Sequence, residues 1–256
     1  MSQKEQKPIY QGAEAIIYQE GDLIIKDRIA KSYRLKILDE KIRKQRTRAE
    51  TKLLEKASSI INCPLPIHQI QRQNDKNNTK IIMPFIKGKK LSEHLDEMPE
   101  KQAEDACIKI GQSIAKLHDN NIIHGDLTTS NIILVEKAEE KNKIFNNKYI
   151  NSKINSQKSP FINKTSKRSL ALVENSNKKD EQQIWFIDFG LGFHSQRIED
   201  KAVDLHLIKQ ALEAKHFQNW EEHYKNILKG YKTSINFNKV LEQLKKVEAR
   251  GRYKGH

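Results

Sequence analysis

The 256-residue sequence has no long hydrophobic run and only two cysteines. No apolar stretch approaches the roughly 18 to 20 residues that span a bilayer, and the polar segment from Met1 to Lys7 lacks the apolar core of a signal peptide. Cys63 and Cys107 are too few for a disulfide framework or a cysteine-based zinc site. We therefore expect no membrane association and a cytoplasmic location, with the nucleus as a second compartment.

Acidic residues are scarce as well. The 33 Asp and Glu oppose 47 Lys and Arg, which gives a formal net charge of +14 and a pI near 9.5. Such a balance favours a polyanionic partner such as nucleic acid. Solvated lysines on loops produce the same composition, so the charge alone leaves both explanations open.

Residues 137–183 differ from the rest of the chain in composition. They are rich in Asn, Lys and Ser, and their apolar residues recur without a helical or strand period. This pattern is typical of a disordered insertion. The remaining 256 − 47 = 209 residues are enough to build a real hydrophobic core.

Residues 1–86 contain short β-prone runs between turn-forming residues, which predicts a small lobe built on an antiparallel meander. A helical pattern from Tyr33 to Ala57 adds one or two helices. The predicted strands are Ile9–Tyr10, Ile16–Tyr18, Leu23–Lys26, Ile67–Gln71 and Lys80–Phe85, with a polar turn at Gln73–Asn78 before the last.

Residues 87–256 show mainly helical periodicity on both sides of the insertion, and residues 250–256 are too polar to pack. The sequence therefore predicts an α+β protein with a β-rich N-terminal lobe (1–86) and a mainly helical C-terminal lobe (87–256). The predicted helices include Ala103–Leu117, Asp200–Ala214, Asn219–Tyr231 and a segment that carries Val240 and Val247.

Two short motifs carry the chemistry. Phosphoryl transfer from ATP needs Mg²⁺ on the phosphates and a carboxylate near the acceptor oxygen. In the segment HGDLTTSN, Asp126 has the place of the catalytic base and Asn131, five residues later, that of a metal ligand. The apolar run before Asp188-Phe189-Gly190 places Asp188 as a second Mg²⁺ ligand. Each motif alone is weak, but both in this order predict an ATP-dependent enzyme.

Lys26 and Glu50 complete the predicted catalytic set. Lys26 ends an apolar strand, from which its ammonium can reach the α and β phosphates, and Glu50 lies on the following helix, where it can fix that ammonium. The plain alternatives are one surface lysine among many and a solvated helix charge.

The expected nucleotide contacts come from two backbone segments. The turn Gly12-Ala13-Glu14-Ala15 between two strands can cradle phosphates with its N–H groups, although it has one glycine where protein kinases show three. Adenine would meet the segment after the last strand, at Met83, Phe85 and Ile86, where the intervening proline offers no N–H.

These motifs together resemble the small atypical kinase subunit of the KEOPS (EKC) complex, a p53-regulating-kinase-like family related to RIO-type kinases. The likeness runs from the turn at Gly12 to Arg252 without the insertion, and includes HGDLTTSN, IDFGLGF and EDKAVDL. It implies a bilobal protein-kinase-like fold, Lys26 and Glu50 as an ion pair, Asp126 as base, and Asn131 and Asp188 as Mg²⁺ ligands. It also implies ATP hydrolysis in support of threonylcarbamoyl-adenosine formation on tRNA, with serine/threonine phosphorylation as a looser possibility.

Three features of the sequence agree with an atypical kinase. Asp204 follows Asp188 by only 204 − 188 = 16 positions, which is too few for a long activation segment with a peptide-docking floor. Gly125 stands where regulated kinases carry an arginine that binds a phosphorylated loop. Thr128 replaces a lysine that stabilises the γ-phosphate. We expect a minimal activation segment, control by partners, and slow transfer or transfer to water.

Two basic regions are candidate partner sites. The segment from Lys26 to Arg48 has ten cations against three acids and is a candidate tRNA-facing stripe, the alternative being a solvated helix face. By resemblance, Arg250, Gly251 and Arg252 would reach the cleft of the transferase subunit, and a frayed terminus is the alternative.

Two other functions remain open at this point. A small-molecule phosphotransferase uses the same motifs. An acidic pocket for a cationic acceptor would favour this function, and the basic helix argues against it. A kinase-shaped, non-catalytic RNA-binding scaffold is disfavoured by the intact Asp126, Asn131 and Asp188. His118 and His124 flank the motif without zinc-ligand spacing, so we expect them to brace the loop through backbone hydrogen bonds.

Overall fold

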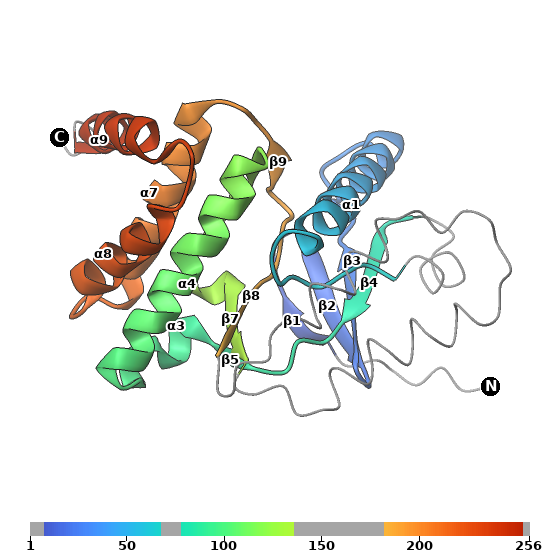
Figure 1. Ribbon diagram of the computed structural model, residues 1–256. Coiled ribbons are helices and arrows are strands. Elements are labelled where there is room, and N and C mark those ends of the chain that lie inside the picture. Colours follow the sequence, from blue (N-terminus) through green and yellow to red (C-terminus); the bar gives the residue numbers. More distant parts are fainter. Residues whose placement is uncertain (1–7, 68–77, 136–181, 253–256) are drawn as a thin grey trace, which may run out of the picture. The chain divides into compact units, whose positions relative to one another are not determined.

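The computed structural model describes residues 8–67, 78–135 and 182–252, with no side-chain description beyond Arg250 (Figure 1). The chain divides into one unit of Met1–Leu134 with Ile184–His256 and another of Val135–Gln183. The predicted insertion at 137–183 lies outside the described residues apart from Gln182 and Gln183. So do all but Ile67 of the predicted strand 67–71 and all but Asn78 of the turn 73–78.

The N-terminal lobe is built on a four-stranded antiparallel sheet in the order β1-β2-β3-β4 (Figure 1). A tight turn joins β2 to β3, and Gly21 in it has φ +57°, a conformation that costs glycine little. The alternation of β3 turns Lys26 and Arg28 toward the same face of the sheet, because residues two apart on a strand share a face. The strands are β1 (Pro8–Gln11), β2 (Ala15–Glu20), β3 (Leu23–Arg28) and β4 (Lys80–Pro84).

A single helix, α1 (Lys36–Ser58), covers the N-terminal sheet, which agrees with the one or two helices predicted (Figure 1). Its second half buries Leu53, Leu54 and Ala57, which join the main hydrophobic core. In its first half the apolar residues do not form the buried face that a helical pattern predicts, because Leu35 before the helix and Leu38 within it are exposed. The only buried residue of the first ten in α1 is charged: Asp39, which accepts from Arg43 Nε at 2.7 Å.

The C-terminal lobe is mainly helical, as predicted. A three-stranded sheet in the order β5-β7-β8 and a two-stranded sheet of β6 and β9 lie among its helices. Its elements are β5 (Lys89–Lys90), α3 (Leu91–His94), η1 (Leu95–Glu97), α4 (Glu100–Asp119), β6 (Ile122–Ile123), η2 (Thr129–Asn131), β7 (Ile132–Val135), β8 (Gln183–Phe186), β9 (Phe193–His194), α7 (Ile198–Lys215), α8 (Trp220–Tyr231) and α9 (Phe237–Arg252).

Two glycines allow α4 and α8 to touch backbone to backbone. A Cβ on Gly111 of α4 would lie 1.9 Å from the Ile227 carbonyl oxygen, and one on Gly230 of α8 would lie 2.0 Å from that of Ile108. Neither distance is sterically possible, so both positions need glycine. Around this contact, Ile110, Ile114, Leu117 and Tyr231 are buried, which makes the helix pair the centre of the core.

The last helix extends into the polar tail. Helix α9 continues to Arg252, and Arg250 Nη1 lies 2.6 Å from Glu199 Oε1 of α7. The Arg250 side chain is 67% exposed, so this contact is a surface ion pair, and the prediction that the tail is too polar to pack is not contradicted. Residues 253–256 lie outside the described part.

Within the described ranges, no helix combines the length and apolar character that a bilayer-crossing segment needs.

Candidate active site

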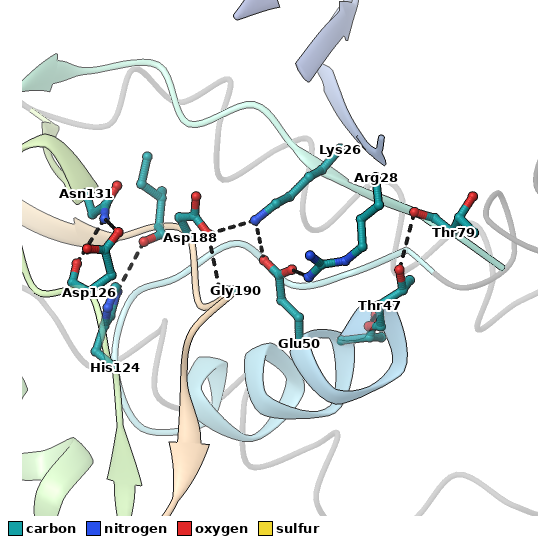
Figure 2. Close-up of polar contacts among 12 residues, drawn as sticks. Lys26, Arg28, Thr47, Glu50, Thr79, His124, Asp126, Asn131, Asp188 and Gly190 are labelled. Atoms are coloured by element: carbon teal, nitrogen blue, oxygen red, sulfur yellow. Dashed lines mark hydrogen bonds and ion pairs between the residues drawn. The ribbon is translucent and has the colours of Figure 1, made fainter. Parts of the chain in front are cut away.

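Lys26 lies between two carboxylates. Its Nζ is 2.7 Å from Glu50 Oε1 on α1 and 2.7 Å from Asp188 Oδ1 after β8 (Figure 2). Burial alone would lower the pKa of this ammonium, but Glu50 and Asp188 together raise it above its ordinary value. The sequence predicted Glu50 as the partner of Lys26, and the structure adds Asp188 as a second partner.

Glu50 has a second cationic partner that the sequence did not reveal. Arg28 Nη2 lies 2.5 Å from Glu50 Oε2, and both side chains are almost fully buried (Figure 2). Arg28 stands two residues after Lys26 on β3, so the alternation of the strand was the available signal. The Glu50 carboxylate is thus shared by two cations from one strand.

Asp126 and Asn131 lie together, as their spacing predicted. Asn131 Nδ2 donates to the Asp126 backbone carbonyl and to Asp126 Oδ2, each at 2.9 Å (Figure 2). The 3-10 turn η2 carries Asn131, and the N–H of Ile187 donates to the Asn131 carbonyl at 2.9 Å. The predicted base and both predicted metal ligands are therefore connected through adjoining backbone.

Asp188 is held in an unusual backbone conformation, with φ +60°. Its Oδ1 accepts from Lys26 Nζ and, at 3.1 Å, from the Gly190 N–H, while about half of the side chain is exposed. Burial would raise the pKa of this carboxyl, but Lys26 and the Gly190 N–H outweigh it and lower the pKa. Asp188 is therefore charged at neutral pH.

The oxygens present suit Mg²⁺, which prefers hard oxygen ligands and keeps sites for water and phosphate. In the described part of the chain, Asp188 Oδ2 and Asn131 Oδ1 have no hydrogen-bond donor, and both belong to exposed or half-buried side chains. No group of three or more His, Cys, Asp or Glu suited to a metal occurs among the described residues. Two protein oxygens with the phosphates supplying the rest is the arrangement expected of a nucleotide-bound Mg²⁺.

Asp204 of α7 holds the backbone at the start of the catalytic loop. Its carboxylate accepts from the backbone N–H groups of His124 and Gly125 at 2.8 and 2.9 Å, and lies 3.2 Å from His118 Nε2. Gly125 has φ +78°, and a Cβ there would lie 2.3 Å from the Leu191 carbonyl oxygen, so glycine is required. No role was predicted for Asp204, although a carboxylate on the apolar face of a helix was a signal.

The two predicted bracing histidines act differently. His124 Nε2 is 3.2 Å from the Ile187 carbonyl, as expected of a backbone contact (Figure 2), whereas the ring of His118 contacts the side chains of Asp204 and Tyr231. Burial lowers the pKa of His124, so it is neutral and donates from Nε2.

A second set of contacts, centred on the buried His216, reaches the same loop. His216 Nδ1 lies 2.7 Å from Asp96 Oδ2, and His216 Nε2 lies 3.1 Å from Thr129 Oγ1 in η2. Nothing in the spacing of these residues predicted the contact, because they come from three distant segments. It fixes the turn that carries Asn131.

The predicted phosphate loop is a closed turn anchored to its surroundings. The Gly12 N–H donates to the Ala15 carbonyl at 3.0 Å, and Ala15 is a buried strand residue. Lys31 Nζ donates to the Ala13 carbonyl, and Arg46 Nη1 lies 2.6 Å from Glu14 Oε2. Of the four predicted residues, Ala13 and Glu14 keep N–H groups that no described residue accepts from.

The predicted hinge offers fewer donors than expected. The Phe85 N–H donates to the Asp22 carbonyl at 2.8 Å, and Pro84 has none. Met83 and Ile86 are half-buried and Phe85 is exposed, so their side chains can line an adenine site. A base at this hinge therefore meets apolar surface more than backbone donors.

The segment after Asp188 is minimal, as predicted. Helix α7 begins at Ile198, only ten residues after Asp188, and the short β9 takes up two of them. No element in this described stretch corresponds to a peptide-docking floor.

The protein kinase domain family matches residues 11–146 of the chain. The KEOPS complex subunit Bud32 of Pyrococcus abyssi is 32% identical over 262 residues, which cover 97% of this chain and 96% of that protein. The chain belongs to the Bud32 family. The resemblance seen in the motifs is thereby confirmed, and a kinase domain as a class uses ATP and Mg²⁺.

Two further comparisons frame this Bud32-family chain. A probable bifunctional tRNA threonylcarbamoyladenosine biosynthesis protein of Methanobrevibacter smithii is 34% identical over 96% of this chain, which spans 36% of that longer protein. The solved structure of WaaP in complex with acyl carrier protein superposes with a TM-score of 0.55 at 9% identity, over 98% of this chain and 90% of WaaP. The second comparison confirms the bilobal kinase-like fold.

The basic segment of this Bud32-family chain is largely occupied by internal contacts. Of the ten cations from Lys26 to Arg48, seven contact a described carboxylate, carbonyl or hydroxyl. The other three, Lys36, Lys41 and Arg48, are exposed and have no such partner in the described ranges. Helical spacing places Lys41, Arg48 and the exposed Lys52 on one face of α1.

Proposed function

We propose that this protein hydrolyses ATP as a KEOPS subunit and thereby supports threonylcarbamoyl-adenosine modification of tRNA, with serine/threonine phosphorylation as a minor activity in the cytoplasm or nucleus. The observation that carries the proposal is the assembled site, in which Lys26 contacts Glu50 and Asp188 and Asn131 is hydrogen-bonded to Asp126. The relatives' names supply the pathway.

Each residue has a defined task in this reaction. Lys26 would leave Asp188 and bind the α and β phosphates, while the oxygens of Asp188 and Asn131 would hold Mg²⁺, which neutralises the phosphates. Asp126, kept in place by Asn131, would orient the attacking oxygen and accept its proton. The turn Gly12–Ala15 and the side chains of Met83, Phe85 and Ile86 would hold the nucleotide.

Water as the main acceptor follows from what surrounds Asp126. Helix α7 starts ten residues after Asp188 and leaves no docking floor for a peptide in this described stretch. Thr128 has no charge to stabilise the transferred group. A half-buried base without a peptide groove favours a small acceptor.

The test is ATP turnover by the full chain, alone and with its transferase partner, comparing the wild type with Asp188→Asn and with Glu40→Gln. Glu40 is an exposed carboxylate paired with Lys44 on α1, so its loss removes the same charge far from the site. We expect Asp188→Asn to lower turnover by on the order of 10³-fold, because it weakens the metal ligand. Turnover that survives in Asp188→Asn would disprove the assignment.

We propose that tRNA contacts the outer face of α1 through Lys41, Arg48 and Lys52. The double variant Arg48→Glu, Lys52→Glu should weaken tRNA binding roughly tenfold. The slope of the logarithm of the binding constant against the logarithm of the salt concentration should become shallower by about two, one for each lost phosphate contact. The matched control is Lys101→Glu, Lys116→Glu, which reverses two exposed charges on α4. Equal losses in both double variants would show that only net charge matters.

We propose that the segment Arg250–Arg252 meets the transferase subunit. Arg250 is exposed beside Glu199, so a partner can reach it without unfolding α9. Removing residues 250–256 should abolish stimulation of ATP turnover by the transferase and leave the basal rate unchanged. Stimulation that persists would refute this contact.

A further inference from the structure

Arg28 holds the same carboxylate as Lys26, and the proposed reaction gives it no task. Its Nη2 lies 2.5 Å from Glu50 Oε2, while Lys26 Nζ lies 2.7 Å from Oε1 (Figure 2). The Arg28 and Glu50 side chains are 4% and 1% exposed, so neither is compensated by water. A buried charge in such a place is costly unless it is paired.

The two cations come from one strand and the carboxylate from one helix. Lys26 and Arg28 share a face of β3, and Glu50 is on α1. A further link lies on the same side, because Thr79 accepts at its carbonyl from Thr47 Oγ1 and from the Arg28 N–H, each at 3.3 Å (Figure 2). Arg28 therefore ties α1 to the sheet independently of Lys26.

This independence matters when Lys26 changes partner. If Lys26 were the only cation near Glu50, an ammonium that turned to the phosphates would leave a buried carboxylate unpaired, at a large cost. Arg28 removes that cost, and the group of Lys26, Arg28 and Glu50 keeps one net positive charge. Such a charge favours a polyphosphate over an uncharged nucleoside.

We propose that Arg28 is a positioning residue that keeps α1 docked and Glu50 paired, so that Lys26 is free to bind the nucleotide phosphates. The part that concerns phosphates rests on the proposed function, whereas the docking of α1 does not. The proposal distinguishes this site from one in which Lys26 alone connects the helix to the sheet.

The first experiment compares the full-length wild type with Arg28→Met, Arg28→Lys and Arg43→Met. Arg43 is the control, because it also pairs with a carboxylate on α1, Asp39, which lies about three turns before Glu50. Binding of MgATP and of adenosine is measured by calorimetry. We expect Arg28→Met to weaken MgATP on the order of tenfold, with adenosine unchanged and Arg28→Lys within about threefold of wild type because a single charged contact is kept.

A double-mutant cycle separates positioning from general charge. In a protein that already carries Glu50→Gln, adding Arg28→Met should change MgATP affinity by less than about twofold, because no carboxylate is left for Arg28 to hold. Equal losses with and without Glu50→Gln would overturn the proposal. If Arg28→Met does not fold, the MgATP affinities of Glu50→Gln with and without Arg28→Met decide the question. The doubly changed protein should fold, because it has no buried unpaired charge at these two positions. In that case Arg28→Lys must also still bind MgATP.

Hydrogen exchange without nucleotide tests the docking of α1 by itself. Amides around Glu50 should exchange at least about threefold faster in Arg28→Met, or in Arg28→Lys to a smaller degree, than in Arg43→Met. Equal exchange in these variants would overturn the proposal even if MgATP binding changed. A wild type that binds no MgATP but shows the exchange difference would refute the proposed function and leave the role of Arg28 in docking intact.

Discussion

The two lobes hold their parts of the site by different means. In the N-terminal lobe, Lys26, Arg28 and Glu50 are buried and pair across β3 and α1. In the C-terminal lobe, an apolar core surrounds one carboxylate, Asp204, which binds backbone N–H groups of the catalytic loop. The first arrangement depends on charge between side chains that can exchange partners, and the second on a fixed shape.

This difference suits the tasks of the two halves. In the proposed reaction Lys26 has to release Asp188 when the phosphates bind, so a group of ion pairs with interchangeable partners is useful. Asp126 and Asn131 have to stay where they are, and hydrogen bonds from a rigid helix to the loop backbone achieve that. The comparison predicts that the C-terminal lobe tolerates substitution less well than the N-terminal lobe.

The strongest test is the loss of the Asp204 carboxylate. Asp204→Ala leaves two backbone N–H groups and His118 without their acceptor in a dry environment, so we expect the free energy of unfolding to fall by about 3 to 4 kcal/mol. Urea denaturation measures it. Asp105→Ala, which removes an exposed carboxylate on α4, should cost less than about 0.5 kcal/mol. Similar losses in the two variants would contradict the role given to Asp204.

The second test compares two glycines. Gly111→Ala places a Cβ 1.9 Å from a carbonyl oxygen of α8, and we expect it to cost about 3 kcal/mol because α4 and α8 must separate. Gly21→Ala in the β2–β3 turn meets open space and only the backbone penalty of φ +57°, about 1 kcal/mol. Thermal unfolding of both variants shows which lobe tolerates its substitution better. If Gly21→Ala were the less stable of the two proteins, the prediction that the C-terminal lobe is the less tolerant one would be wrong.

The third test concerns the protonation of a buried histidine, His124, in the C-terminal lobe. Burial lowers the pKa of His124 below its ordinary 6.5 in the folded protein. As the pH falls below about 6.5, the unfolded chain takes up a proton that the folded protein refuses, so the free energy of unfolding declines by up to about 1.4 kcal/mol per pH unit for this group. Above that pH the stability should be flat on this account.

His124→Gln should make the decline shallower when unfolding is measured between pH 7 and pH 5. His223 has a pKa that burial also lowers, so part of the slope should persist. If the free energy of unfolding of His124→Gln fell with pH as steeply as that of the wild type, His124 would take up its proton without cost. That result would contradict the assignment of His124 as a neutral ring that donates from Nε2 to the Ile187 carbonyl.

The parts of the fold and site that follow local rules could be predicted from the sequence. Strand and helix periodicity indicated both lobes, and the order and spacing of the motifs predicted that Lys26 pairs with Glu50 and that Asp126 and Asn131 share one loop. The contacts of Asp204, Arg28 and His216 could not be predicted in this way, because each depends on segments far apart in the chain. A buried charge looks the same in sequence as a solvated one.

The basic segment shows the same limit. Ten cations against three acids suggested one continuous stripe, but Arg34 and Arg43 bind Asp39, and Arg46 binds Glu14. A local count of charges misses acids from other segments and acids that bind two cations. The three cations left over, Lys36, Lys41 and Arg48, all lie on α1.

The pairing of Arg28 with Glu50 also shapes how an inhibitor could be built. A compound that reached past Lys26 would meet an arginine and a carboxylate that already satisfy each other, and apolar groups that separated them would leave both charges unpaired. Selective compounds for this protein should therefore stop at Lys26 and leave the Arg28–Glu50 pair intact. That requirement separates this protein from drug targets whose interior is apolar at the same depth.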